Sequence, residues 1–189
     1  MRKLSGFPLI ITADFIVRSA YQVGKTPMLP VYAASLGAAD VFLGMIMSVS
    51  TLTGMILKPF IGILSDHWGR RIWLLIGTGL FVGIPFLYRF VETPEQLFFI
   101  RSIHGLSTAI YGPVTLAYVS ELSADNRAER LGWFSSARNA SYIIGPSISG
   151  FMMLKFDPVS IFTVIGLVSI VAFIPVCILP ETSTGSTSR

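Results

Sequence analysis

Charged residues are scarce in this sequence, where they make up only 13% of 189 residues. A soluble domain of this length carries charge on about a quarter of its positions. Hydrophobic residues make up 52%, and the mean hydropathy is +0.70. So few charged residues cannot keep a folded chain soluble in water. We therefore do not expect a soluble enzyme, a nucleic-acid-binding module or a disordered regulator. The composition predicts a membrane protein.

Cysteine and histidine are almost absent. The one cysteine, Cys177, excludes an intrachain disulfide and lies in an apolar run, where we expect a small buried side chain. The two histidines, His67 and His104, are expected on opposite sides of the membrane, so they do not predict a metal site. No nucleophile and base stand at a recognisable catalytic spacing. We therefore expect no enzyme activity, no cofactor and no metal.

Long apolar runs dominate the chain. A membrane-spanning helix needs about 20 mostly apolar residues, and six such segments follow one another: 7–29, 41–64, 72–90, 96–122, 131–154 and 159–179. The connectors between them are too short to hold separate domains. We therefore expect an all-α, polytopic membrane protein with six transmembrane helices in one domain, residues 1–182, and a polar tail at 183–189.

The positions of lysine and arginine predict the orientation of the chain, because cytoplasmic loops carry an excess of both. With the N-terminus inside, seven fall on the cytoplasmic side and three on the outer side. The seven are Arg2, Lys3, Arg70, Arg71, Arg127, Arg130 and Arg189, and the three are Lys25, Arg89 and Lys155. We therefore expect an integral, multi-pass protein with both termini in the cytoplasm.

Several ionisable side chains lie inside these apolar segments, where each one costs at least about 2.5–3.5 kcal/mol. They are Asp14, Arg18, Lys58, Arg101, His104 and Arg138. Lys58 is about two turns from the end of its segment, so we expect its ammonium to reach the cytoplasmic side. A passive membrane anchor has no use for the others, which predict a functional site.

Two interpretations of this set remain open. Asp14 and Arg18 are four residues apart, so they can neutralise each other as a local ion pair on one helix. Alternatively, the first, fourth and fifth segments enclose a polar cavity, because all three contribute charged or ionisable side chains. We favour the cavity, because a local pair explains only the charges of the first segment.

Asp14 is the only carboxylate deep inside any of the six segments, so it is the candidate proton carrier. Burial favours the protonated form of a carboxyl group, whereas a nearby cation favours the ionised form. The sequence leaves open which effect dominates.

The connector after the second segment holds the most specific motif. Residues 62–71 read Gly-Ile-Leu-Ser-Asp-His-Trp-Gly-Arg-Arg and resemble the signature of the major facilitator superfamily, G-x-L-[AS]-D-x-x-G-R-[RK]. Gly62 and Gly69 permit a close helix approach and a tight turn, and Asp66 can meet the positive end of a helix dipole. The two arginines that end the motif are expected to anchor the connector in the cytoplasm.

Two further stretches resemble motifs of the same superfamily. Residues 101–105, Arg-Ser-Ile-His-Gly, resemble R-x-x-x-G, whose arginine the resemblance associates with proton coupling. Residues 141–150 resemble the antiporter motif G-x-x-x-G-P-x-x-G-G. Gly145, Pro146 and Gly150 match this motif, whereas serines replace two of its glycines, which keeps the side chains small but weakens the assignment.

Simpler interpretations of both stretches remain open. Gly145 and its neighbours can form only a kinked packing face, because small residues let membrane helices approach closely. Arg101 can be an interfacial anchor near the outer boundary, and His104 can be a packed polar side chain rather than a proton relay.

The resemblance covers residues 7–182 and is strongest to the drug/proton antiporter branch, including tetracycline-type exporters. It implies two six-helix halves, each made of two inverted three-helix repeats, that move small molecules by alternating access. This chain would then be the N-terminal half in the plasma (inner) membrane. Three explanations remain open: it is a fragment of a longer transporter, it pairs with a second six-helix half, or it forms a homodimer. Its expected partners are the lipid bilayer, a small-molecule substrate and protons, and no nucleic acid.

The resemblance also implies roles for individual residues. The expected cytoplasmic gate consists of Gly62, Asp66, Gly69, Arg70, Arg71 and Glu121, and within it we expect Arg70 to pair with Glu121. Proton-coupled export would use Asp14, with Arg101 modulating it. The alternatives are a uniporter or symporter for sugars or organic ions, and a non-transporting regulatory membrane protein that retains the fold.

Overall fold

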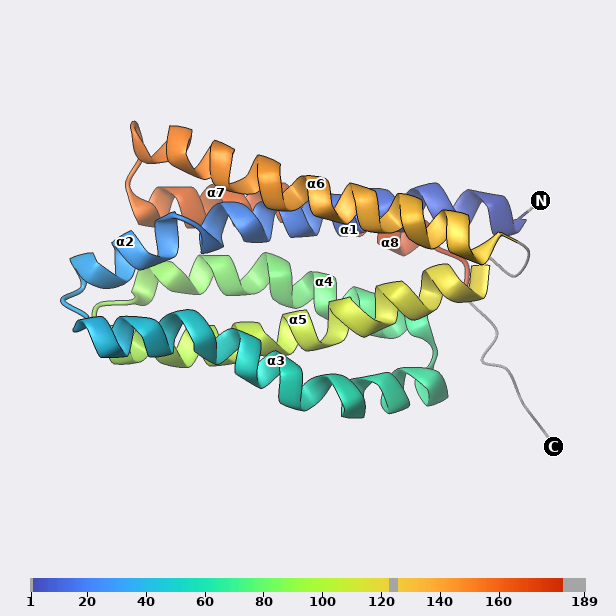
Figure 1. Ribbon diagram of the computed structural model, residues 1–189, viewed down its shortest axis with the longest axis horizontal. Helices are drawn as coiled ribbons and strands as arrows, with labels where there is room; N and C mark the ends of the chain where they lie inside the picture. Colours follow the sequence, from blue (N-terminus) through green and yellow to red (C-terminus); the bar gives the residue numbers. More distant parts are fainter. Residues whose placement is uncertain (1, 123–125, 182–189) are drawn as a thin grey trace.

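The structure, a computed structural model, describes residues 2–122 and 126–181, and every element in these ranges is a helix (Figure 1). The elements are α1 (Arg2–Lys25), α2 (Met28–Ser35), α3 (Asp40–Trp68), α4 (Arg70–Leu87), the 3-10 helix η1 (Tyr88–Phe90), α5 (Pro94–Leu122), α6 (Arg127–Met153), α7 (Pro158–Ile170) and α8 (Phe173–Ile178). The all-α prediction is therefore confirmed. The tail expected at 183–189 lies outside the described residues.

Two of the expected segments are each divided into two helices. The first continues to Ser35, beyond its expected end, with a break at Pro27 between α1 and α2. The last is interrupted after Ile170, before α8 with its Pro175. Proline interrupts a helix because it has no N–H to donate and its ring crowds the preceding turn.

α3 is longer than its apolar segment. It runs to Trp68, so Ser65–Trp68, which were expected in a connector, are helical. The chain then reverses at Gly69, whose φ of 88° is accessible to glycine and disfavoured for other residues. Hydropathy does not mark this end, because a helix can continue past its apolar part into water.

α7 begins where the sequence provides a cap. Ser160 donates its hydroxyl to Asp157 Oδ1 at 2.6 Å and its backbone N–H to Oδ2 at 3.0 Å. These two hydrogen bonds hold the pKa of Asp157 below its ordinary value of 3.8. Pro158 takes the first helical position, where no N–H is needed. The carboxylate is therefore ionised at neutral pH and satisfies the first turn of the helix.

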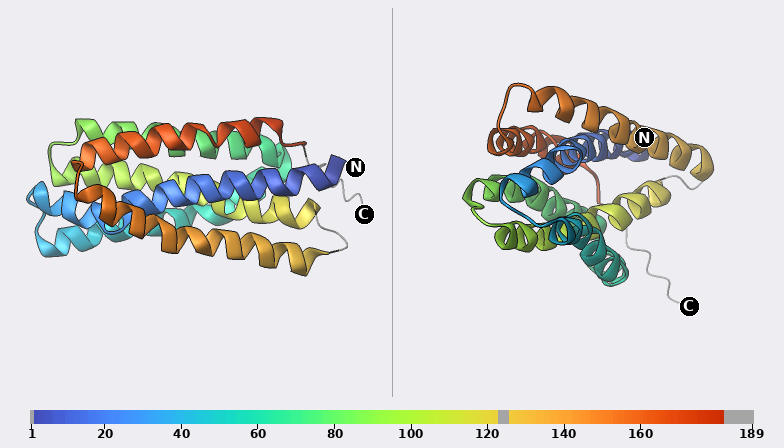
Figure 2. Two further views of the ribbon diagram at one scale, coloured as in Figure 1. Left: turned by 90° about the horizontal axis from the view of Figure 1, so that it is seen from above. Right: turned by 60° about the vertical axis from the view of Figure 1, so that its left-hand side comes forward.

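The helices pack as two long pairs. α1 lies along α6, and α3 lies along α5. α4 packs against α5 and α7, and α1 also contacts α7 and α8. The left view of Figure 2 shows α4, α7 and α8 on one side of the bundle and α6 on the opposite side, with α1 between them. This arrangement places α1 in the interior, where its polar residues meet those of its neighbours.

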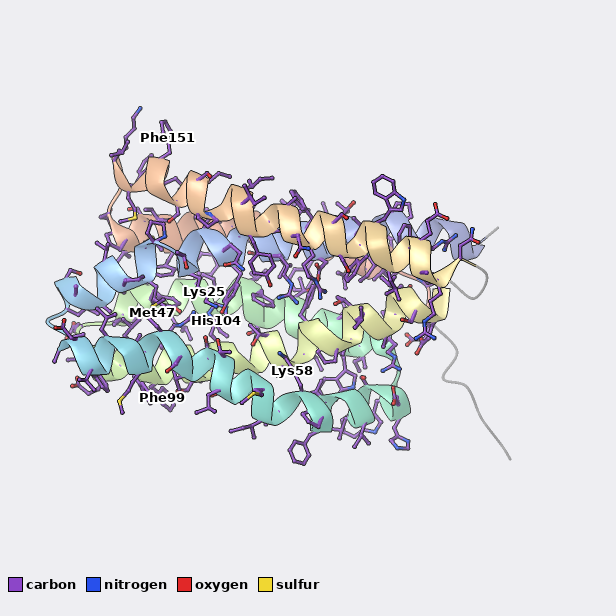
Figure 3. The ribbon with its side chains drawn as sticks, in the orientation of Figure 1. Lys25, Met47, Lys58, Phe99, His104 and Phe151 are labelled. Carbon is purple, nitrogen blue, oxygen red and sulfur yellow. The ribbon has the colours of Figure 1, made fainter. Side chains whose placement is uncertain are left out.

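Large apolar side chains cover much of the outside of the bundle. Phe99 and Phe151 are more than 60% exposed, and Figure 3 shows both pointing away from the other helices. Such a surface suits lipid rather than water. Cys177 is also exposed, so the expectation of a buried thiol is wrong. In a membrane helix an apolar run faces lipid as well as the core, and hydropathy does not separate the two.

Three helical segments are long and apolar enough to cross a membrane. They are Asp40–Trp68, Arg70–Phe90 and Pro158–Ile178, which comprise α3, α4 with η1, and α7 with α8. Within the described residues, α1, α5 and α6 do not meet this criterion. These are the helices that carry Asp14, Arg101 and Arg138, so the ionisable residues that lower hydropathy are concentrated on them.

Candidate functional site

Asp14 lies at the centre of a group of side chains from α1, α5 and α6, which we call the Asp14 cluster: Asp14, Arg18, Thr115 and Arg138. Arg138 donates from Nε to Asp14 Oδ2 at 3.0 Å and from Nη2 to Oδ1 at 2.8 Å. The same Nη2 donates to Thr115 Oγ1 at 2.8 Å. Asp14 is only 1% exposed, so the cluster contains a bidentate ion pair buried between α1 and α6.

Arg138, rather than Arg18, is the main partner of Asp14. Arg18 Nε lies 3.5 Å from Asp14 Oδ1, at the limit of a hydrogen bond, whereas both contacts from Arg138 are short. The local pair on α1 is therefore present but secondary. The charges of the first and fifth expected segments meet between their helices.

Arg101 and His104 lie in a separate group, which we call the Arg101 cluster: Tyr21, Ser50, Tyr88, Arg101 and His104. Arg101 Nη2 donates to Ser50 Oγ at 2.6 Å, and its guanidinium carbon lies 5.8 Å from the centroid of the Tyr21 ring. His104 Nδ1 lies 3.4 Å from the Tyr88 hydroxyl. The five ionisable residues expected around one cavity therefore occupy two places in the bundle.

Arg101 and His104 are both buried inside the bundle. Arg101 is 2% exposed and lies among residues of α1, α3 and η1, so it is not an interfacial anchor. His104 packs edge-on against Tyr21 and Phe81, with ring centroids 5.0 and 5.5 Å apart, and lies inside the bundle (Figure 3). Throughout residues 2–122 and 126–181, no carboxylate is within ion-pair distance of Arg101. Its neighbours are hydroxyl groups and aromatic rings.

Lys58 was expected to extend along α3 toward the C-terminal end of that helix, but its side chain lies beside α5. Its Cε lies 3.8 Å from the position that a Cβ on Gly112 would take. Lys58 and Gly112 stand equally far from the C-terminal ends of α3 and α5, and Figure 3 shows Lys58 pointing from α3 toward α5. Its stem therefore lies at mid-height, beside Gly112 and near Arg18, and the residue as a whole is exposed.

Arg70 joins the ends of α3, α4 and α5. Its Nε donates to Glu121 Oε1 at 2.9 Å, and its Nη1 donates to Ser65 Oγ at 2.6 Å. Its Nη2 forms an ion pair with Asp66, one turn earlier in the chain. The structure thus contains the contact between Arg70 and Glu121 that the sequence suggested.

Gly62 and Asp66 make fewer contacts than the motif implies. Among the described residues, no atom lies within 4 Å of the position that a Cβ on Gly62 would take. The side chain of Asp66 is 59% exposed and pairs with Arg70 rather than with a helix N-terminus. The surface of α3 that carries Gly62 and Asp66 is therefore largely uncovered by the rest of the described chain.

Glu181, just after α8, joins the same group and was not among the candidate residues. Its Oε1 accepts a hydrogen bond from the backbone N–H of Arg71 at 3.4 Å, in the first turn of α4, where an anion is favoured. Beside it, Tyr118 donates its hydroxyl to the carbonyl of Pro180 at 2.7 Å. Glu181 follows the last apolar segment on the side that holds Arg71, which is the signal that could have identified it.

Substituting alanine at Gly69 tests the contact with Glu181. Gly69 and Gly37 both have positive φ, 88° and 84°, so alanine is expected to cost about 1–3 kcal/mol of backbone strain at either one. At Gly69 the new Cβ would also overlap Glu181 Oε1, whereas no atom of the described residues lies within 4 Å of the corresponding position at Gly37. We expect Gly69→Ala to lower the thermal unfolding midpoint in detergent more than Gly37→Ala. Equal losses would contradict a tight contact.

The comparisons with known proteins agree with these motifs. The family model described as Major Facilitator Superfamily matches residues 15–188, which is most of the chain. This chain belongs to the Major Facilitator Superfamily. As a member of this family of membrane transporters, it is an integral membrane protein.

Two groups of relatives within the superfamily are bacterial resistance proteins. The quinolone resistance protein NorA of Staphylococcus aureus is 32% identical over 164 residues, which are 85% of this chain and 42% of NorA. The multidrug resistance protein 1 of Bacillus subtilis is 31% identical over 127 residues, which are 67% of this chain and 33% of that protein. The chain therefore spans less than half the length of the curated relatives it matches.

The antiporter-like motif of the superfamily lies on α6 where it faces α1. Ser141, Gly145 and Ser149 are all buried and four residues apart, so they form one stripe along the helix. A Cβ on Gly145 would overlap Cβ of Gln22. The two serines, both fully buried, keep the stripe small on either side of Gly145. Within the described chain no atom approaches Gly150, which lies off this stripe, and Pro146 is half-buried beside it.

Proposed function

We propose that this chain is the N-terminal half of a secondary transporter that exports small molecules by proton-coupled alternating access. The observation that carries the proposal is the buried ion pair between Asp14 of α1 and Arg138 of α6. Taking such a pair out of water costs several kcal/mol per ion, which a passive bundle has no reason to bear. The names of the relatives, a quinolone resistance protein and a multidrug resistance protein, support the export of drugs.

Protonation of Asp14 is the proposed coupling step. A proton on either carboxylate oxygen removes the negative charge, so the attraction to Arg138 is lost. Because the two side chains belong to α1 and α6, this loss frees the two helices to shift against each other. Arg138 keeps its hydrogen bond to Thr115. The guanidinium therefore stays in the interior, where it recaptures Asp14 when the proton leaves.

The packing supports six spans arranged as two three-helix repeats. In that arrangement α1 corresponds to α5, α3 to α6, and α4 to the pair of α7 and α8. By this correspondence, the pair of α1 and α6 is equivalent to the pair of α5 and α3. These are the two long pairs of the bundle. In the same way, the contact of α1 with α7 and α8 is equivalent to the contact of α5 with α4. Matching neighbours are expected of related repeats.

The proposed gate lies at the end of the bundle where α1 begins and α8 ends (Figure 1). Arg70, with Asp66 and Glu121, ties α3, α4 and α5 together, and Glu181 adds the end of α8. We place this end in the cytoplasm, with the protein in the plasma membrane. A second six-helix half, or a second copy of this chain, would cover the open face beside Gly62 and complete the substrate path.

Flux driven by a pH gradient tests the proposal. The chain is reconstituted in liposomes, alone and with a second six-helix half, and uptake of a fluorescent quinolone is followed before and after a protonophore collapses the gradient. We expect accumulation that disappears with the gradient. Flux that is unchanged by the protonophore would contradict proton coupling and favour a uniporter. Absence of flux from both preparations, with the chain inserted and monodisperse, would contradict transport.

A further inference from the structure

The interior of the bundle contains more cations than anions. Asp14 is the only buried carboxylate among residues 6–122 and 126–181. Arg101 is buried as well, and the side chains of Arg18 and Arg138 are only 11% and 19% exposed. An uncompensated charge in a low-dielectric interior is costly. The excess of cations therefore favours the binding of an anion.

The excess is greatest beside the Asp14 cluster. Both carboxylate oxygens of Asp14 accept hydrogen bonds from Arg138, which also bonds Thr115. Arg18 shares this carboxylate through one contact of 3.5 Å from its Nε. Its two terminal nitrogens make no hydrogen bond within the described part of the chain, so they remain able to bind an anionic group.

Lys58 brings a second cation to the same point. The position that a Cβ on Gly112 would take lies 3.8 Å from Lys58 Cε and 3.9 Å from Arg18 Nη2. Two helices, α1 and α3, thus direct positive charges over one glycine of a third helix, α5. In the ranges that the structure describes, no carboxylate pairs with Lys58. Like charges on neighbouring helices repel each other, and an anion between them would offset that repulsion.

We propose that Arg18 and Lys58 bind the carboxylate of a transported organic anion over Gly112. The guanidinium presents paired N–H groups that match a carboxylate, and the ammonium adds a point charge from the opposite side. Gly112 leaves room for the anion, because it has no side chain between the two cations. This inference rests on the proposed transport function, and it assigns the substrate class: small molecules that carry a carboxylate.

Equilibrium binding without a pH gradient tests the site separately from transport. The purified chain in nanodiscs is titrated with 2-naphthoate, a fluorescent carboxylate, and with 2-naphthamide, its neutral counterpart. We expect saturable binding that favours the carboxylate. Lys58→Gln and Arg18→Gln should each weaken 2-naphthoate about tenfold, which is the loss expected for one charged hydrogen bond. Neither should change the affinity for 2-naphthamide.

Three further variants serve as controls. Lys58→Arg keeps the cation and should restore the affinity, whereas Lys155→Gln removes an exposed lysine at the end of α6 and should have no effect. Gly112→Leu should block binding without removing a charge. Lys58→Glu should reverse the preference toward 2-naphthylmethylammonium, a gain that misfolding cannot produce.

The outcomes separate the site from the transport function. Equal affinities for carboxylate and amide in the wild-type chain would overturn the anion site, even if the chain transports other molecules. Loss of 2-naphthoate binding when a second six-helix half is added would overturn it too, because a carboxylate of that half would then be the partner. Carboxylate binding that depends on Lys58 supports the site, whether or not proton-driven flux is found.

Discussion

Replacing Asp14 with asparagine is expected to abolish proton-driven flux and to destabilise the bundle by about 3–5 kcal/mol. The substitution leaves Arg138, whose side chain is only 19% exposed, between α1 and α6 without the carboxylate that now accepts two of its hydrogen bonds. An asparagine amide can accept one of these bonds, but it cannot neutralise the guanidinium. One preparation provides both measurements: uptake driven by a pH gradient in liposomes, and the thermal unfolding midpoint in detergent.

A double substitution separates the two effects of losing Asp14. Asp14→Asn combined with Arg138→Gln removes both charges, and a neutral pair of similar volume is expected to have little net effect on stability. We therefore expect the double variant to unfold near the wild-type midpoint and still to lack proton-driven flux. Asp40→Asn, which changes an exposed carboxylate at the start of α3, should alter neither measurement. Recovery of flux in the double variant would show that Asp14 does not carry the proton.

The helical fold and the family could be predicted because both depend on local patterns. Apolar runs indicate the helices, and the ten residues 62–71 carry a signature that is specific in spacing. The contact between Arg70 and Glu121 was accessible by the same means, because both residues stand at the ends of apolar segments on one side. Charges at the same end of a bundle have few alternative partners.

The main partner of Asp14 could not be chosen from the sequence. Arg138 is 124 residues away, and counting from the helix ends shows only that the two residues lie at similar depth. Depth does not determine which direction each side chain points around its helix, and that direction decides the contact. For the same reason, Arg101 and His104 were expected beside Asp14, although they pack against Tyr21 instead.

Which side chains are buried or in contact could not be predicted from the sequence either. An apolar run in a membrane helix has one face toward its neighbours and one toward lipid, so Cys177 could not be assigned to either. Lys58 is exposed, and the structure adds that its stem lies beside Gly112, close to Arg18. Glu181 was overlooked because its partner, the first turn of α4, lies 110 residues earlier in the chain. Each of these features depends on how the helices are assembled.

Gly145→Leu is expected to have the second large effect, because it forces α1 and α6 apart. Even the first added carbon would overlap Cβ of Gln22 and crowd the backbone of Gln22 and Val23, at 3.1 Å from each. Backbone atoms of a packed helix cannot move aside singly, so the whole helix must shift. Overpacking typically costs about 1–3 kcal/mol, and occasionally more. We expect a clear fall in the thermal unfolding midpoint and in the yield of monodisperse protein.

Gly150→Leu is the matched control, since it makes the same change on the same helix where no atom of the described chain lies within 4 Å. We expect its midpoint to stay close to that of the wild type. The comparison also concerns the mechanism, because α1 and α6 carry the two halves of the ion pair between Asp14 and Arg138. If the close approach at Gly145 sets the distance between the Asp14 and Arg138 side chains, the proposed proton site depends on the spacing of α1 and α6. Equal midpoints for the two leucine variants would show that the helices are not held together at Gly145.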